Sequence, residues 1–377
     1  MRVIIFILLL FIYSYSSSQV PDSTKADSVL LKEIETQMKD KGTEQPIAPV
    51  RNSISTNPDI GVIGDFQSSY ISKGKKNLDL YLNEAEVSFQ AVVDPYARAD
   101  FFIGFGRDPE TGKYGVEVEE GYLTTLSLPA HLQLKVGKFK EAIGRINPVH
   151  AHALPFIDLP NAFVNYFGSD GLNDEGASLS WILPNKKFYQ ELLFQVTSGK
   201  GESPSFYRGD NDRLLYLGHL KNFFTLGENA TLELGLTGIT GPNDSLQTTN
   251  IGSVDLTYKW KPVKMNTYHS LTWQSELYFS NRGFGSLGNK KSFGLYSFLQ
   301  YQLAKRWFLT GRYDHSQLPI DKSIVQNAIS LTAGWYATEF SKLELEIKTT
   351  DDNIQSRFYE GWLRWIFVIG AHGAHQY

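Results

Sequence analysis

Two histidines and an aspartate lie close together in a stretch of the chain that could bind a metal ion. His150 and His152 are separated by one residue, and Asp158 follows a few positions later. Imidazole nitrogens and carboxylate oxygens are ligands that Zn²⁺ takes in proteins. The spacing supplies no fourth ligand. His150 and His152 are therefore candidate metal ligands on a weak pattern, and two structural histidines are the alternative.

Basic residues around the histidines could select ions. Cationic side chains at a narrow passage favour anions, and the predicted constriction consists of Lys135, Lys138, Lys140, Arg145 and Asp158. Carboxylates also fall on or near stretches predicted to face the same interior, namely Glu84, Glu86, Glu119, Glu120, Glu191, Glu233, Glu276, Glu344 and Glu346. Mixed charge is typical of a solvated interior with cross-strand ion pairs. A basic wall opposite an acidic one is the other interpretation.

The segment that carries the histidines, residues 147–173, is the longest break between the predicted strands and is rich in apolar side chains. Prolines at 148, 155 and 160 stiffen it. Its apolar residues need cover, and they are Leu154, Phe156, Ile157, Leu159, Phe163, Val164, Tyr166 and Phe167. We expect the segment to fold inward and narrow a pore. A folded cap over the mouth is the alternative.

The elements that must position these residues are strands. In residues 254–260, apolar and polar side chains alternate with a period of two, which places them on opposite faces of a strand. About sixteen such stretches follow Pro58, separated alternately by tight turns and longer polar loops, the pattern of a barrel in an outer membrane. The predicted fold is all-β: a transmembrane antiparallel β-barrel of about 16 strands (14–18), with the long third extracellular loop folded into the lumen.

The ends of the chain predict export. Residues 1–18 have a basic start, an apolar run and small polar residues, as in a secretory signal peptide. Residues 19–58 form a predicted periplasmic extension and linker, and residues 59–377 the barrel. The C-terminal strand and terminal Tyr377 are of the kind that barrel-assembly machinery reads. The expected location is the outer membrane of a Gram-negative bacterium, in contact with its lipid.

Composition excludes several classes of function. The net charge of −4 gives no argument for nucleic acid, and the absence of cysteine excludes disulfides and thiolate metal sites. Metalloprotease, serine-hydrolase and phosphate-loop motifs are missing from the sequence. We expect neither catalysis nor a cofactor. Asp314 and His315 form the only catalytic dyad that the sequence suggests, and a loop-edge pair without chemistry is the alternative.

Four stretches carry a resemblance to a known group of proteins. They are VGKFKEAIGR at residues 136–145, DPYARAD at 94–100, TEFSKL at 338–343 and IGAHGAH at 369–375. In these the chain resembles porin-like outer-membrane proteins of the Bacteroidetes type, a group distantly similar to the phosphate-selective porin O/P family. The resemblance implies a 16-strand trimeric passive channel. A run of arginines for phosphate selectivity is missing, so that substrate does not carry over.

Two hypotheses about function follow. The first is a channel for passive diffusion of small hydrophilic solutes or ions, filtered by residues 147–173. The second is a non-conducting barrel with a structural, ligand-binding or metal-binding role, in which the same segment and lumen residues such as Tyr296 and Phe298 close the pore.

Overall fold

The structure is a computed structural model, and it describes residues 58–73, 78–108, 111–201, 203–209, 212–354 and 356–370. The predicted signal peptide (1–18) lies outside these residues, as does the predicted extension (19–58) except for Pro58. Tyr377 is also outside them.

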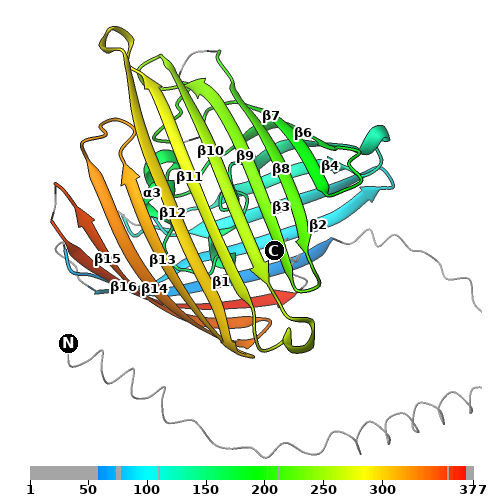
Figure 1. Cartoon of the computed structure of the whole chain (residues 1–377), viewed down its shortest axis with the longest axis vertical. Helices are drawn as coiled ribbons and strands as arrows, with labels where there is room; N and C mark the ends of the chain where they lie inside the picture. Colours follow the sequence, from blue (N-terminus) through cyan, green and yellow to red (C-terminus); the bar gives the residue numbers. More distant parts are fainter. Residues whose placement is uncertain are drawn as a thin grey trace, which may run out of the picture. The chain divides into compact units, whose positions relative to one another are not determined.

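Sixteen strands follow one another along the described chain (Figure 1). They are β1 Asp59–Ile71, β2 Leu78–Asp94, β3 Ala97–Gly106, β4 Glu117–Thr125, β5 Leu132–Lys140, β6 Asn173–Ile182, β7 Tyr189–Thr197, β8 Leu215–Leu226, β9 Ala230–Pro242, β10 Thr248–Trp260, β11 Leu271–Gly283, β12 Asn289–Ala304, β13 Trp307–Gln317, β14 Val325–Thr338, β15 Ser341–Asp352 and β16 Phe358–Gly370. The helical elements are short: η1 Pro129–His131, η2 Ala151–Ala153, α3 Asn161–Phe167, η3 Val263–Met265 and η4 Gly285–Leu287. Among the described residues, no helix has the length and apolar character to cross a membrane.

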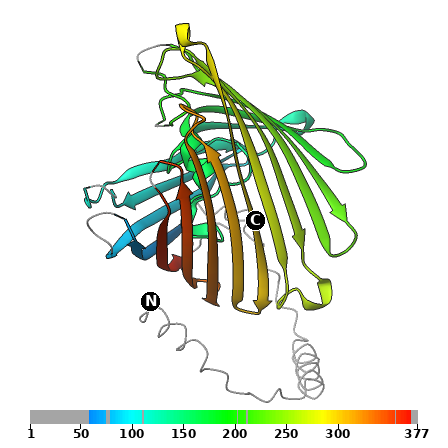
Figure 2. The ribbon, with the colours of Figure 1, turned by 60° about the vertical axis from the view of Figure 1, so that its left-hand side comes forward.

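The strands form one closed antiparallel barrel. Each strand pairs with its neighbour in sequence, and β16 pairs back onto β1, with Gly370 opposite Gly61. Figures 1 and 2 show long tilted strands running around this ring. The predicted all-β barrel of 16 strands is therefore confirmed. Closure leaves no unpaired strand edge, which is the condition for a sheet to exist in lipid.

The alternation of side chains explains why the sheet closes around a polar interior. On β15, Glu344, Glu346 and Lys348 are buried on the inward face, whereas Ile347 points outward and is 53% exposed. The same apolar exposure recurs around the ring at Val136, Leu179, Leu192, Phe194, Leu236, Val254, Phe279, Leu299, Leu309, Leu331 and Leu363. An apolar outside and a polar inside is the reverse of a water-soluble barrel and fits a lipid surrounding.

Two β-bulges turn additional polar side chains inward. The register between β1 and β2 shifts after Asp65, so Asn83 has no partner opposite it. Between β3 and β4 the register shifts after Phe102, which leaves Glu119 as the extra residue. A bulge interrupts the strict alternation of faces and re-aims a side chain. Glu119 and its neighbour Glu120 consequently both contact an interior histidine.

The connection between β5 and β6, here called the crossing segment (residues 141–172), contacts strands on opposite sides of the ring. It contains η2 and α3, and α3 packs against β12 and β13. Phe156, Phe163, Tyr166 and Phe167 are buried in one apolar cluster with inward residues of the wall, among them Tyr278. Burial of these aromatic side chains gives the segment its hydrophobic stabilisation.

Candidate functional site

The crossing segment is tied to the β13–β15 wall through Asp158. Its carboxylate accepts hydrogen bonds from Arg312 Nη2 at 2.8 Å and from Lys348 Nζ at 2.6 Å. Arg312 Nη1 also donates to the Asp158 carbonyl at 2.8 Å. Burial raises the pKa of Asp158, but the charges of Arg312 and Lys348 outweigh it, and the net effect lowers that pKa. Asp158 therefore remains an anion that holds two wall cations.

Arg364 on β16 binds the backbone of the same segment. Its guanidinium donates to the carbonyl oxygens of Phe156 at 2.9 Å and of Leu154 at 3.3 Å. Glu344 on β15 balances its charge at 2.7 Å. Both side chains are buried, so the pair is shielded from solvent and salt. Carbonyl groups that would otherwise lie buried without partners are satisfied in this way.

Glu276 on β11 receives the other end of the segment. Its Oε1 accepts the backbone N–H groups of Arg145 at 2.8 Å and Ile146 at 2.9 Å. Tyr278 donates its hydroxyl to Oε2 at 2.6 Å. Gly144 makes this approach possible because it has φ of 57°, and a Cβ there would lie 2.0 Å from Glu276 Oε2. A left-handed conformation and a close contact both require glycine at this position.

His150 lies between carboxylates of β2 and β4. Its Nδ1 is 2.8 Å from Glu86 Oε2 and 3.3 Å from Glu119 Oε2, and its Nε2 is 2.8 Å from Glu120 Oε1. Burial lowers the pKa of His150, but hydrogen bonds to these three glutamates overcome that effect and raise the pKa well above its usual value. Without another cation in the cluster, His150 is an imidazolium that offsets part of the glutamate charge.

His152 joins the same cluster. Its Nδ1 lies 3.7 Å from Glu86 Oε2, and its ring centre is 5.5 Å from that of His150. One ligand atom from each of Glu86, His150 and His152 lies within 4.8 Å of the others, and all three residues are buried. The β-strand wall thus supplies a carboxylate beside the two histidines, a residue that the local sequence pattern could not identify.

A polar cavity of about 1080 Å³ remains beside the crossing segment. Residues of β1–β6, β15 and β16 line one side of it, and residues of the segment line the other. Carboxylates outnumber basic groups in this lining. The acidic residues are Asp79, Glu84, Glu117, Glu119, Asp158, Asp170 and Glu360, and the basic ones are Arg107, Lys140 and Lys348, with His150 in addition.

The structure brings only part of the predicted constriction to this cavity. Lys140 and Asp158 line it. Lys135 lies over the Tyr122 ring, with Nζ 4.0 Å from the ring centre, and Arg145 pairs with Glu233 of β9 at 3.2 Å. Lys138 shares a strand face with the outward Val136, by the two-residue period, and its Nζ is 2.8 Å from Glu117. A constriction formed by all five residues stays a prediction.

Asp314 and His315 do not face one another. Asp314 is buried and lies 3.2 Å from Arg312, whereas His315 Nδ1 is 2.8 Å from Asn327 Oδ1. Consecutive residues of a strand point to opposite faces, so this strand cannot bring the two side chains together as a dyad.

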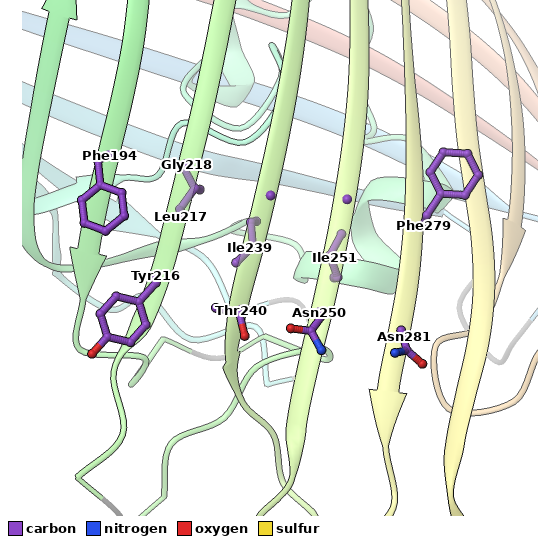
Figure 3. Close-up of a pocket in the computed structure, with 12 residues that line it drawn as sticks. Phe194, Tyr216, Leu217, Gly218, Ile239, Thr240, Asn250, Ile251, Phe279 and Asn281 are labelled. Carbon is purple, nitrogen blue, oxygen red and sulfur yellow. The ribbon is translucent and has the colours of Figure 1, made fainter.

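A shallow groove lies on the outer face of β7–β11 (Figure 3). Gly218, Gly238 and Gly252 stand opposite one another on three adjacent strands, which leaves its floor without side chains. Phe194 and Phe279 are half exposed at its two sides. The groove has a volume of about 550 Å³, and Phe194 and Phe279 give it apolar sides.

The comparisons with known proteins agree with this architecture. No family model matches the chain. An uncharacterised protein of Aquifex aeolicus is 28% identical over 85% of this chain and 80% of its own length. Among solved structures, OmpF of Salmonella typhi is similar with a TM-score of 0.58 and 10% identity, over 83% of this chain and 98% of that one.

Two further structures are similar at the same low identity. OprB of Pseudomonas putida has a TM-score of 0.57 and 10% identity, over 90% of this chain and 97% of its own. An anion-selective porin from Comamonas acidovorans has a TM-score of 0.56 and 10% identity, over 83% of this chain and 99% of its own. The chain therefore has the fold of outer-membrane porins. The narrower resemblance to the Bacteroidetes type and the O/P family is not confirmed by these similarities.

Proposed function

We propose that the protein is a passive channel of the bacterial outer membrane for small hydrophilic solutes and ions, with the crossing segment as its filter. The observation that supports this proposal is the polar cavity of about 1080 Å³ between this segment and the wall of β1–β6, β15 and β16. A lipid-facing exterior and a polar interior support a transmembrane position, and the porin fold of the similar structures supports a channel.

The charges at the cavity favour cations over anions. Arg107 and Lys348 are each held by a carboxylate, Asp79 at 2.8 Å and Asp158 at 2.6 Å. Glu119 and Glu360 add further negative charge to the lining. Rings of acidic side chains raise the local concentration of cations and oppose the entry of anions. The preference is therefore the reverse of that expected from the basic residues of β5 alone.

Conductance in planar lipid bilayers tests the channel. Purified, heat-modifiable protein is expected to produce stepwise currents. In a salt gradient, the reversal potential is expected to have the sign of a cation-selective channel. Folded protein that stays silent over many insertions would refute the channel. Currents with anion selectivity would refute only the assigned preference.

The second candidate is a barrel closed by the crossing segment. Phe156 packs against Phe298 with ring centres 5.4 Å apart, and Tyr166 against Tyr278 at 5.8 Å, so the segment fills the β11–β13 side of the interior. A variant with residues 148–165 replaced by a short Gly-Ser linker distinguishes the two. A plug predicts currents only in the deletion variant, whereas a filter predicts currents in both proteins and a larger conductance after deletion.

The partners proposed for this function are outer-membrane lipid, the barrel-assembly machinery and two further copies of the chain. OmpT of Vibrio cholerae, whose trimer form is similar with a TM-score of 0.56 and 10% identity, supports a homotrimer. Native mass spectrometry of the detergent-extracted protein tests the oligomer. The proposal includes no catalytic step.

A further inference from the structure

The buried cluster around Glu86 has the arrangement of a metal site. The Nδ1 atoms of His150 and His152 lie 2.8 Å and 3.7 Å from Glu86 Oε2. Zn²⁺ bonds to nitrogen and oxygen ligands are about 2.0–2.2 Å long, so tetrahedral ligands lie roughly 3.4 Å from one another. Glu119 Oε2, 3.3 Å from His150 Nδ1, is in position to be a fourth donor. The observed spacings bracket the distance that such an ion requires.

Two further observations point to a bound cation. Glu86 Oε1 is buried and has no hydrogen-bond partner among the described residues, although a buried carboxylate oxygen normally has one. Glu120 accepts from the far nitrogen of His150 at 2.8 Å. A carboxylate behind a metal-binding histidine is the usual support that fixes the ring and leaves its other nitrogen for the metal. When the proton of the neutral His150 ring is on Nε2, Nδ1 carries a lone pair for the metal and faces Glu86 and Glu119.

The fold builds this arrangement from elements far apart in the chain. The bulge on β4 turns Glu119 inward beside Glu120, and the short turn η2 presents His150 and His152 to the same wall. Gly104 on β3 leaves the room for Glu119, because a Cβ at this glycine would lie 2.1 Å from the Glu119 carboxylate. The carboxylates of Glu86 and Glu119 are set on strands of the closed sheet, which hold ligands more precisely than loops do.

We propose that Glu86, His150, His152 and Glu119 bind a divalent transition-metal ion of the Zn²⁺ class. Imidazole with carboxylate selects Zn²⁺ or a similar ion over Ca²⁺ and Mg²⁺, which take oxygen ligands. The ion ties residues 150–152 of the crossing segment to β2 and β4, whereas Arg312 and Arg364 hold other residues of the segment on β13 and β16. The site stands apart from the channel proposal, since an ion could fix the segment in a conducting or a closed barrel.

Metal content of the full-length protein tests the site. Protein purified in detergent is stripped with EDTA, dialysed against Zn²⁺ and analysed by elemental mass spectrometry. One Zn²⁺ per chain is expected, and Co²⁺ in its place is expected to give the visible absorption of a four-coordinate ion. His150→Ala and Glu86→Gln are expected to lose both signals. Glu120→Gln, which removes only the support of His150, is expected to weaken binding roughly 10- to 100-fold.

Matched controls separate this site from adventitious binding. His219 is a buried histidine on β8 that bonds to Thr237 at 2.8 Å, so His219→Ala is expected to retain the ion. His372→Ala/His375→Ala removes the histidines at the C-terminus and is also expected to retain it. A difference in migration between boiled and unboiled samples on an SDS gel confirms that each variant is folded. Absence of stoichiometric Zn²⁺ in the wild type, or its retention in folded His150→Ala and Glu86→Gln, would overturn the proposal whether or not the protein conducts.

Discussion

Arg312 on β13 and Asp158 in the crossing segment form an ion pair of 2.8 Å, although 154 positions separate them in the chain. The Arg312 side chain is fully buried, and Lys348 approaches the same carboxylate at 2.6 Å. One aspartate thus determines how the segment meets the wall of β13 and β15. Buried charges without a partner are unfavourable, so the ionised carboxylate of Asp158 stabilises the segment in this position.

Replacement of this aspartate is expected to loosen the segment. Asp158→Asn leaves Arg312 and Lys348 without a shared anion and should lower the free energy of unfolding by about 3 kcal/mol. Urea unfolding in lipid vesicles, followed by tryptophan fluorescence, measures the change. Asp351→Asn removes an exposed partner of Arg357, and we expect little or no loss because solvent screens this pair. Equal losses in the two variants would contradict the anchoring role of Asp158.

Gly144 is expected to tolerate no side chain. In Gly144→Ala, the methyl group would lie 2.0 Å from Glu276 Oε2, and φ of 57° is unfavourable for alanine. We expect a loss of roughly 1–3 kcal/mol in stability, together with altered conductance as residues 145 and 146 leave Glu276. Gly311→Ala on β13 is the control, because nothing lies within 4 Å of its Cβ position. A neutral Gly144→Ala would show that the segment bends elsewhere.

The strands could be predicted from sequence because their signal is local. A period of two over roughly ten residues determines which side chains face lipid, and closure of the sheet follows from apolar exteriors on every strand. The inward charge at Glu344 and Glu346 also follows from this alternation, and both residues are buried in the interior.

The candidate site could be predicted only in part. His150 and His152 stand out because they are neighbours in the chain, but Glu86 and Glu119 are their partners only through the closed sheet. The bulge that turns Glu119 inward breaks the alternation on which face assignment depends. Arg312 and Arg364 could not be identified for a different reason. A single arginine at an inward strand position looks like any other lumen residue in the sequence, and only the fold shows that the crossing segment binds to it.

Charge removal at Lys140 is expected to alter ion selectivity. Lys140 lines the polar cavity, so Lys140→Gln leaves a more negative lining and should raise the cation preference. Lys135→Gln is a matched control on the same strand, because its ammonium lies over the Tyr122 ring and not at the cavity. Reversal potentials in a salt gradient measure both. A shift in Lys135→Gln without one in Lys140→Gln would place the conducting path elsewhere.

Glu141 is expected to make the stability of the protein depend on pH. This residue follows β5 and is buried to 1% exposure, and burial is the main cause that raises its pKa from the usual 4.5 to about 8. The folded protein therefore keeps the proton over a range in which the unfolded chain releases it. This contribution to stability is fully present below about pH 4.5 and is lost as pH rises towards 8.

Glu141→Gln tests this dependence, because its amide retains the shape of the neutral acid and cannot ionise. Unfolding free energies measured from pH 4 to 9 are expected to fall by a few kcal/mol in the wild type and by less in the variant. Asp321 is exposed, and hydrogen bonds from Ser323 lower its pKa, so Asp321→Asn should retain the wild-type slope over this range. If Glu141→Gln keeps the full slope, the titrating group is elsewhere. If it removes the slope, the neutral carboxyl of Glu141 at the start of the crossing segment is the group that makes stability depend on pH.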